Sequence, residues 1–569
     1  MKNKFDVDVF NNKWLVAAIC FIEVLVFITI VKVRFETNDD TAMNLIASGS
    51  LTGSPSELLI FTNVSIGYLL KWLYSTTGNI NWYTWYLIAS FYVGYYALQF
   101  QIGKLVLQRN YKLIIHLFLL LLLLPSLQYL QFTRVAAVVL LGGFSMVLIS
   151  FHKNRISYLF ALLIILLGAS IRIHVFYMYC LLVLPFLMVP ILRKEYGKLQ
   201  WIAVAIVAVF SMEFISKQVY VSDPAWKNFQ QINFLRARVT QHDNLNFTFN
   251  NVRSVIEKCG WTFDDFEMAS NFNYDVGIDK FSTENLKKIY EETNTLNNIK
   301  SPRFLFEKLI LNITGFVEYI IGRSYICLLS LFFIILLLKR SWLRMGMAIF
   351  YLLYVIFTAC LLTVLADTNT EKERVIWSMV LPFFALLLTL AFSSRPIFDR
   401  WDSFKSIRFS KVLDYALFLV LFFCMFLGLN DIIRQEKKDT NYSPEVSKFL
   451  NNQPYEFYVS WCGNEPESVF SMPQNYKKAY FLGWYVGSPF NLEKLKNYTG
   501  KPETGLYSIR NKEIVWYFRN DGYYYDVMRY HEKMQNFYKS NFKDCKITER
   551  IIPLNSKDTV FQYNVFVPN

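Results

Sequence analysis

The chain has 569 residues, of which 54% are hydrophobic and 18% aromatic, whereas only 18% are charged. This composition excludes an ordinary soluble domain, because apolar runs near the ~20 residues that cross a bilayer recur along the first three quarters of the chain. The formal net charge of +14 does not indicate nucleic-acid binding, since the basic residues are spread over short loops between apolar runs, where membrane topology explains them.

The apolar runs predict a mainly α-helical, polytopic membrane bundle of about eleven spans. The first run, WLVAAICFIEVLVFITIVKV, has no small-residue cleavage site, so we interpret it as a retained span and not as a signal peptide. The expected spans cover residues 14–32, 82–103, 113–130, 135–151, 156–171, 175–192, 200–217, 324–338, 345–366, 375–393 and 412–430.

The basic residues give the bundle a direction. An odd number of spans that starts in the cytoplasm ends outside it, and cytoplasmic loops are enriched in Lys and Arg. The N-terminal segment and the loops placed inside carry nineteen such residues. The short loops placed outside carry only Arg134, Arg172, Lys372 and Arg374. The sequence therefore predicts a cytoplasmic N-terminus and an extracytoplasmic C-terminus.

One further apolar segment, LLIFTNVSIGYLLKWLY at about residues 58–74, is assigned to the membrane interface. Polar residues and Lys71 interrupt it, and a crossing there would invert every later loop against the charge pattern. Aromatic residues in and after this segment predict a belt at the outer interface: Trp72, Tyr74, Trp82, Tyr83, Trp85 and Tyr86.

These assignments divide the chain into two parts. Residues 1–430 form the expected membrane module, with external loops at residues 33–81 and 218–323. Residues 431–569 are polar and aromatic, with strand-like runs such as EFYVSW, EIVWYF and FQYNVFV separated by turn signals. They predict a small extracytoplasmic α/β domain.

Acidic residues follow the first span directly, in the segment RFETNDD. Carboxylates at a lipid boundary are unfavourable unless they are solvated, paired or bound to a metal. A solvated loop would explain any one of them, but the adjacent pair Asp39 and Asp40 favours a functional site.

Other external turns hold cations at a similar depth, at Arg134, at Arg172 with His174, and at Lys372 with Arg374. A guanidinium offers paired donors and a permanent charge to phosphate oxygens. We therefore interpret these residues as a phosphate-binding set. Each alone could equally contact a lipid headgroup or pair with a neighbouring helix, and His174 could be structural.

The chemistry that such a set supports is glycosyl transfer from a lipid-phosphate sugar. One carboxylate would accept the proton of an acceptor hydroxyl, while the cations stabilise the departing phosphate. The adjacent carboxylate would orient that base or hold a divalent cation such as Mg²⁺ or Mn²⁺. Both roles are open to Asp39 and to Asp40.

The external loop 218–323 mixes basic, acidic and aromatic residues. A solvated amphipathic cap over the spans would explain it. The alternative is an acceptor-binding surface, with an aromatic side chain available for sugar stacking. The candidates are Arg236, Arg238, His242, Arg253 and Trp261.

The position and type of Asp39 and Asp40 resemble the acidic motif in the first external loop of the GT-C superfamily of polytopic glycosyltransferases. The stretches NDDTAMNLIASGSLTGSP, QFTR, IRIH and FNNVRSVIEKCGW are similar to a group of bacterial membrane proteins, over roughly the first half of the chain. The resemblance implies an inverting glycosyltransferase of the bacterial cytoplasmic membrane. It would move a sugar from a polyprenyl-phosphate donor to a cell-surface glycan or lipid-linked acceptor on the outer face.

Two other activities of surface-glycan assembly stay open. A polysaccharide polymerase or ligase would depend on Arg134, Arg172 and Arg236 more than on the aspartates. A flippase would place charges near the bilayer midplane and could show repeat symmetry. Glu23, inside the first span, is the best candidate for such a charge, and an interhelical hydrogen bond is its expected role.

Overall fold

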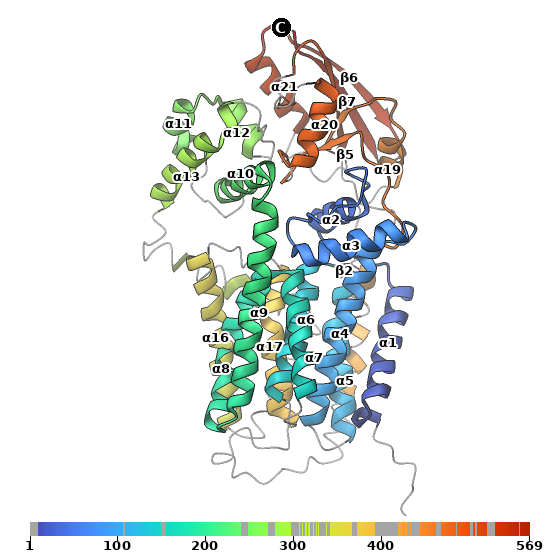
Figure 1. The fold of residues 1–569 in the computed structure, drawn as a ribbon, viewed down its shortest axis with the longest axis vertical. Helices are drawn as coiled ribbons and strands as arrows, with labels where there is room; N and C mark the ends of the chain where they lie inside the picture. Colours follow the sequence, from blue (N-terminus) through green and yellow to red (C-terminus); the bar gives the residue numbers. More distant parts are fainter. Residues whose placement is uncertain are drawn as a thin grey trace, which may run out of the picture.

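The computed structural model describes most of the chain outside residues 298–341 and 393–443. The described ranges are 9–105, 109–149, 155–240, 248–270, 279–297, 342–366, 373–392, 444–461, 468–484, 486–500, 505–506, 509–520, 530–556 and 558–568, with scattered positions in 306–337 and 419–434. Within them the protein is mainly helical, and a long helical bundle carries a smaller mixed domain at one end (Figure 1).

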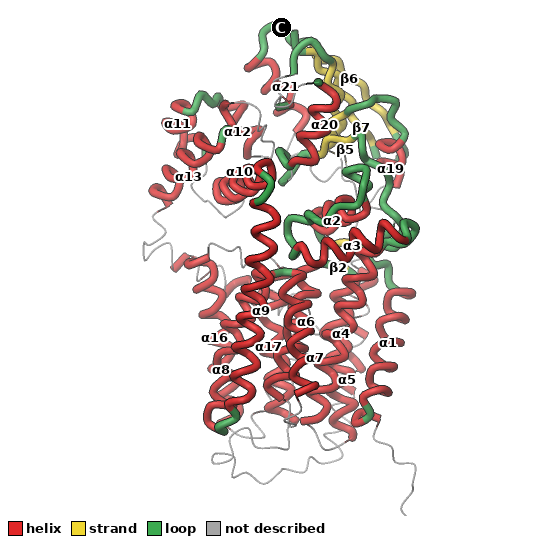
Figure 2. Tube along the Cα trace, in the orientation of Figure 1, coloured by secondary structure: helices red, strands yellow, loops and turns green. Residues whose placement is uncertain are grey.

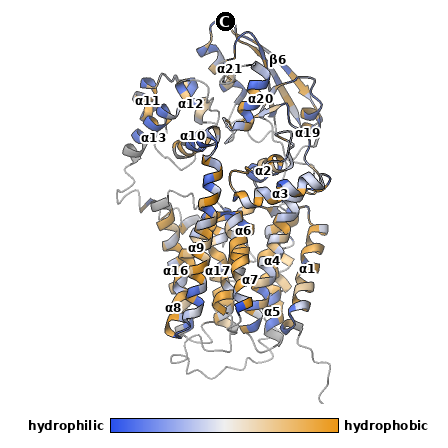
Figure 3. Ribbon diagram, viewed as in Figure 1, coloured by the Kyte–Doolittle hydropathy of each residue, from blue (hydrophilic) through white to orange (hydrophobic). Residues whose placement is uncertain are grey.

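The bundle helices follow the predicted apolar runs. They are α1 (Lys13–Ile30), α4 (Trp82–Leu105), α5 (Arg109–Leu123), α6 (Phe132–Ile149), α7 (Arg155–Ile171), α8 (Ile173–Leu192), α9 (Tyr196–Val221), α16 (Trp342–Ala366) and α17 (Glu373–Phe392). Of these, α1, α6, α8, α9, α16 and α17 are long and apolar enough to cross a membrane. Figure 3 shows apolar residues along the whole bundle. The chain is a multi-pass membrane protein.

The total of eleven spans stays a prediction, as does the orientation. The helices α5 and α7 belong to shorter apolar stretches, Lys112–Leu127 and Arg155–Ile171. Two expected spans, 324–338 and 412–430, lie largely outside the described residues.

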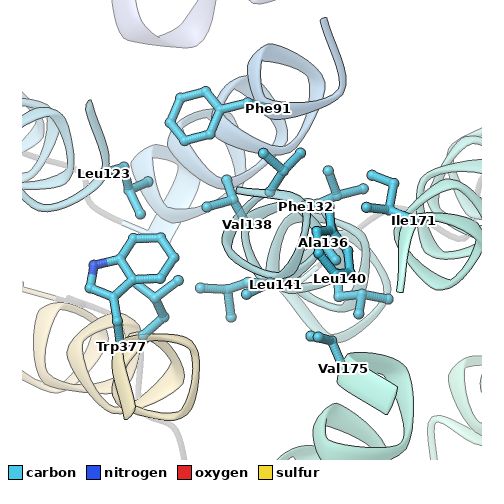
Figure 4. Close-up of a cluster of buried hydrophobic side chains, with 14 of the residues drawn as sticks. Phe91, Leu123, Phe132, Ala136, Val138, Leu140, Leu141, Ile171, Val175 and Trp377 are labelled. Atoms are coloured by element: carbon cyan, nitrogen blue, oxygen red, sulfur yellow. The ribbon is translucent and has the colours of Figure 1, made fainter. Parts of the chain in front are cut away.

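The helix α6 is the centre of the bundle. Of its apolar stretch, 83% is buried, compared with 17% for α1. Figure 4 shows side chains of α6 close to Phe91 of α4, Ile171 of α7, Val175 of α8 and Trp377 of α17. Helices in a membrane pack closely where small residues let backbones approach. Gly94 of α4 provides such a contact, because a Cβ there would lie 2.6 Å from the Cα of Val139.

A polar contact within the bundle confirms the expectation for Glu23. The hydroxyl of Tyr95 donates to Glu23 Oε2 at 2.9 Å, and His116 Nε2 lies 2.6 Å from Glu23 Oε1. These contacts join α1 to α4 and α5, so Glu23 is an interhelical hydrogen-bonding group.

Two short helices, α2 (Asn38–Ser48) and α3 (Val64–Thr76), lie across one end of the bundle instead of running along it (Figure 1). This is the orientation that an interfacial segment requires. The predicted aromatic belt is only partly right. Trp72 and Trp85 are 61% and 38% exposed. Tyr74 and Tyr83 are buried instead, and their hydroxyls donate hydrogen bonds to buried polar side chains.

The C-terminal domain lies at the same end as α2 and α3, and Figure 2 shows nearly all strands gathered there. Its five-stranded sheet has the order β4-β3-β5-β7-β6. The strand β3 pairs in parallel with β4 and β5, whereas β7 pairs antiparallel with β5 and β6. The strands are β3 (Tyr458–Trp461), β4 (Ala479–Phe481), β5 (Glu513–Asn520), β6 (Lys546–Pro553) and β7 (Thr559–Phe566), and the helices α19 (Pro444–Asn451), α20 (Pro489–Thr499) and α21 (Tyr530–Asn541). A C-terminal domain of mixed α/β structure is therefore confirmed.

The loop predicted at residues 218–323 supplies a helical cap beside this domain: α10 (Pro224–Thr240), α11 (Phe249–Lys258), α12 (Phe263–Ser270) and α13 (Thr283–Asn297). The cap and the sheet share one hydrophobic core. Lys280 also links Asp265 of the cap, at 2.9 Å, to Asn541 of the C-terminal domain, at 2.6 Å. The cap is therefore packed against the C-terminal domain.

Candidate active site

The site starts from a short backbone pairing between distant parts of the chain. The two-residue strand β1 (Arg34–Phe35) pairs in parallel with β2 (Tyr129–Leu130). Each strand is followed, after one or two residues, by a helix, which is α2 in the case of β1 and α6 in the case of β2. The pairing therefore places the acidic segment at the start of α2 beside the turn that carries Arg134.

Asp40 is completely buried at the start of α2. Its Oδ1 accepts hydrogen bonds from the Tyr83 hydroxyl at 2.9 Å and from the Phe132 amide at 3.2 Å, and its Oδ2 accepts from the Thr37 hydroxyl at 3.2 Å. Burial raises the pKa of this carboxyl well above its usual value, against the effect of the three donors. Asp40 is thus held rigidly inside the protein.

Asp39 is placed differently although it is the adjacent residue. Its side chain is only partly buried, and no hydrogen bond from another described residue reaches its carboxylate. It lies close enough to Arg172 to stabilise that cation. Both acids are in the first turn of α2, where the helix dipole favours negative charge. Only Asp39 has a carboxylate available to a ligand.

Arg172 lies immediately before α8 and interacts electrostatically with this acid. Its guanidinium carbon lies over the rings of Phe61 and Phe132, at 5.3 and 5.1 Å, and Nη1 donates to the Phe61 carbonyl at 3.5 Å. Burial lowers the pKa of Arg172 to about 10, while the charge of Asp39 opposes this shift. The group remains cationic at neutral pH. Arg374, in the first turn of α17, repels it and therefore lies nearby.

Arg134 has carboxylate partners of its own. Its Nε and Nη2 donate to the two oxygens of Glu36 at 2.8 and 3.1 Å, and Nη2 also contacts Glu373 at 3.4 Å. Glu373 in turn pairs with Arg323. Arg134 is 4% exposed, so it is neutralised within the protein and joins α6 to α17.

Of the remaining predicted phosphate ligands, His174 has no hydrogen bond or ion pair with Asp39 or Asp40 among the described residues. His174 is exposed in the first turn of α8, and its ring lies 6.3 Å from that of Tyr177. Lys372 lies outside the described residues. Among the predicted cations, Arg172 is therefore the one that an electrostatic interaction connects with Asp39 and Asp40, whereas Arg374 and His174 interact with Arg172 itself.

The predicted acceptor residues belong to the helical cap. Arg236 donates to Asn233 one turn away, and Arg253 pairs with Glu257 at 2.7 Å on the exposed face of α11. Trp261 is buried and donates to the carbonyl of Lys280. The Arg238 side chain and His242 lie outside the described residues. Figure 1 shows α11, α12 and α13 well apart from α2, so the structure does not bring Arg253 and Trp261 to the acids.

Sequence reasoning missed four residues that shape the site: Tyr83, Phe132, Phe61 and Trp484. A signal was present for Tyr83. Tyr83, Leu87, Phe91 and Tyr95 follow one another at four-residue intervals on α4 and are all buried, so helical periodicity places Tyr83 on the inner face. The contacts of the other three join segments far apart in the chain and leave no local pattern.

The divalent cation expected at Asp39 and Asp40 stays a prediction. Both oxygens of Asp40 already accept hydrogen bonds. Over the described part of the chain, no group of three or more His, Cys, Asp or Glu side chains gathers in a way that could hold a metal ion. Mg²⁺ and Mn²⁺ prefer several oxygen ligands, which one available carboxylate does not supply.

Comparisons with known proteins give one pair of structural likenesses. No family model matches the chain, and no curated protein matches it in sequence. Two crystal structures of ArnT from Cupriavidus metallidurans, one bound to undecaprenyl phosphate and one in the apo state, align over 96% of this chain and 97% of theirs. The TM-score is 0.38 for both, and the sequence identities are 11% and 10%. A likeness of this degree decides neither the fold nor the activity.

Proposed function

We propose that this protein is a membrane glycosyltransferase that moves a sugar from a polyprenyl-phosphate donor to a hydroxyl group of a cell-surface glycan or lipid-linked acceptor. The observation that carries the proposal is that the available carboxylate of Asp39 lies near enough to Arg172 for an electrostatic interaction, at the end of an apolar bundle. An available carboxylate and a permanent cation at the bilayer boundary are the two charges that transfer from a lipid phosphate needs.

Asp39 is the general base. Its carboxylate accepts the proton of the acceptor hydroxyl as the hydroxyl oxygen attacks the anomeric carbon of the donor sugar. Asp40 does not touch the substrate. It holds the first turn of α2 through Tyr83, Phe132 and Thr37, and so fixes the direction in which Asp39 points.

Arg172 and Arg374 serve the leaving group. As the new bond forms, the bond between the anomeric carbon and the phosphate oxygen breaks, and its electron pair leaves with the polyprenyl phosphate. The negative charge that develops on that oxygen is stabilised by the guanidinium groups. Attack opposite to the leaving phosphate inverts the anomeric centre.

The site lies where such a donor would reach it. The apolar bundle can hold the polyprenyl chain in the lipid, while α2 and α3 lie across its end at the level of the headgroups (Figure 3). We place this end on the outer face of the bacterial cytoplasmic membrane, in keeping with the distribution of Lys and Arg in the sequence.

The alternatives have less support among the described residues. A polymerase or ligase that depends on Arg134, Arg172 and Arg236 would need these arginines together. Arg134 is bound by Glu36, and Arg236 belongs to α10 of the cap. For a flippase, Glu23 would be the intramembrane charge, but it is bonded to Tyr95 and His116.

The test compares two substitutions in the full-length protein, reconstituted in nanodiscs. Radiolabelled polyprenyl-phosphate hexoses and pentoses are supplied with a membrane extract as acceptor, and transfer of label to water-soluble or lipid-linked glycan is measured. Asp39→Asn should lower the rate by about 10²–10⁴-fold, with thermal stability unchanged. Arg172→Ala should weaken the binding of the polyprenyl phosphate. Wild-type transfer by Asp39→Asn would overturn the proposal.

A further inference from the structure

Phe61 holds Arg172 in two ways. Its carbonyl accepts the hydrogen bond from Arg172 Nη1 at 3.5 Å, and its ring lies under the guanidinium at 5.3 Å. The ring is also stacked with that of Phe132, with centroids 6.2 Å apart and planes inclined by 9°. The position of Phe61 therefore sets the position of the cation.

The backbone next to Phe61 is strained. Ile60 has a φ of +74°, a conformation that β-branched residues rarely adopt. Such strain persists only where the surroundings enforce it, and it occurs most often at functional sites. Here Tyr220 of α9 accepts a hydrogen bond from the Ile60 amide at 2.8 Å, and Ser170 of α7 accepts one from the Asn63 amide at 2.8 Å. The bundle thus holds this segment from both ends.

The C-terminal domain holds Phe61 as well. The ring of Trp484 packs against it with centroids 4.6 Å apart, and Trp484 is 5% exposed. Trp484 follows strand β4 in the turn that leads to α20. Gly483, with a φ of +121°, lets the chain reverse there. The turn places the indole against Phe61, in the segment between α2 and α3.

We propose that Trp484 and Phe61 are positioning residues, through which the docked C-terminal domain holds the Arg172 guanidinium in place. The role that this gives to Arg172 rests on the proposed function, but the positioning itself does not. Removal of the indole leaves the Phe61 ring without this packing partner. The ring and its carbonyl can then no longer hold the cation in one orientation toward Asp39.

A second aromatic contact between the same two parts of the protein provides a matched control. Phe470 of the C-terminal domain packs against Trp85 of α4 with centroids 5.5 Å apart. Neither Phe470 nor Trp85 contacts Arg172 among the contacts of the described residues. Phe470→Ala therefore weakens docking of the domain without changing the surroundings of the cation.

The first measurement follows Arg172 directly. Full-length protein in nanodiscs is treated with phenylglyoxal, which modifies accessible arginines, and the modification of each arginine is quantified by mass spectrometry. Trp484→Ala should raise the rate at Arg172 about tenfold, a loss of protection equivalent to about 1.4 kcal/mol, whereas Trp484→Phe should stay within about twofold of wild type. Phe470→Ala should leave Arg172 unchanged, and the exposed Arg253 should react equally in every variant.

The second measurement separates this inference from the proposed function. Binding of ³²P-labelled farnesyl phosphate should weaken about tenfold in Trp484→Ala and stay near wild type in Phe470→Ala. If the wild type binds no farnesyl phosphate, the phosphate-binding role of Arg172 fails, while the modification rates still decide the positioning. Unchanged modification of Arg172 in a folded Trp484→Ala protein, or an equal increase in Phe470→Ala, overturns the inference. Trp484→Leu replaces Trp484→Ala if the latter does not fold.

Discussion

The hydroxyl of Tyr83 donates a hydrogen bond of 2.9 Å to Asp40, and both side chains are completely buried. This contact joins helix α2, after the first span, to helix α4. It distinguishes two adjacent aspartates that are otherwise chemically alike. Asp40 becomes part of the framework, whereas Asp39 keeps a carboxylate that a substrate can reach.

Asp40→Ala should destabilise the protein strongly. It leaves the Tyr83 hydroxyl and the Phe132 amide buried without an acceptor, at a cost of about 1–3 kcal/mol for each donor. Asp40→Asn should be milder, because the amide oxygen can replace Oδ1, and the Thr37 hydroxyl can rotate to accept from the amide nitrogen. Thermal unfolding in detergent tests whether Asp40→Ala is less stable than Asp40→Asn. An Asp40→Ala protein as stable as Asp39→Ala would contradict it.

Arg134→Met should also destabilise the protein. The substitution keeps the apolar stem but leaves Glu36 without its bidentate partner, and breaking a buried pair in this way costs about 3–5 kcal/mol. The matched control is Arg253→Met, which breaks the exposed pair with Glu257 on α11 and should leave the melting temperature unchanged. If the two variants melt together, Arg134 does not have this structural role.

The contact between α4 and α6 depends on one of two glycines in α4. Gly94→Ala should destabilise the bundle by about 1–3 kcal/mol, because the new Cβ would lie 2.6 Å from the Cα of Val139 and force the helices apart. Gly103 has no atom within 4 Å of the same position. Gly103→Ala should therefore stabilise the helix by up to about 1 kcal/mol. Thermal unfolding of both variants tests this; equal effects would show that the close approach is unimportant.

A lysine in the C-terminal domain should make stability depend on pH. Lys494 Nζ donates to the carbonyls of Tyr476 and Ala479 at 3.2 and 2.6 Å, and burial lowers its pKa from 10.5 to about 7. Between these values the unfolded chain binds more protons than the folded one, so this group makes stability rise with pH from about 7 to about 10.5. Below pH 7 its unfavourable contribution is complete.

Lys494→Met should remove this slope, as measured by the melting temperature of the full-length protein at pH 6.5, 8 and 9.5. Lys496→Met, at an exposed position of the same helix, should retain it. A slope that survives in Lys494→Met would assign the pH dependence to another group.

The amino-acid sequence by itself predicted the apolar helical bundle, the interfacial segment and the polar C-terminal domain. Runs of apolar residues with the length of a bilayer have few alternatives to a helix, because lipid offers no partner for free backbone groups. The interfacial segment, the mixed C-terminal domain and the approximate bounds of most helices followed from the same local patterns. The cluster of acids after the first span was also visible, since a charge at a lipid boundary is unusual wherever it occurs.

Only the tertiary structure decided what each charged residue does. Asp39 and Asp40 share the same first turn, and Arg134 and Arg172 occupy similar turns between apolar helices. Local sequence patterns therefore predict the same role for both members of each pair. The pairing of β1 with β2 brings Asp40 to the amide of Phe132, which donates to it. The same pairing brings Arg134 to Glu36, with which it forms an ion pair. Trp484 packs on Phe61, which lies under Arg172. Burial and pairing depend on partners tens to hundreds of residues away, and such partners leave no periodic trace in the sequence.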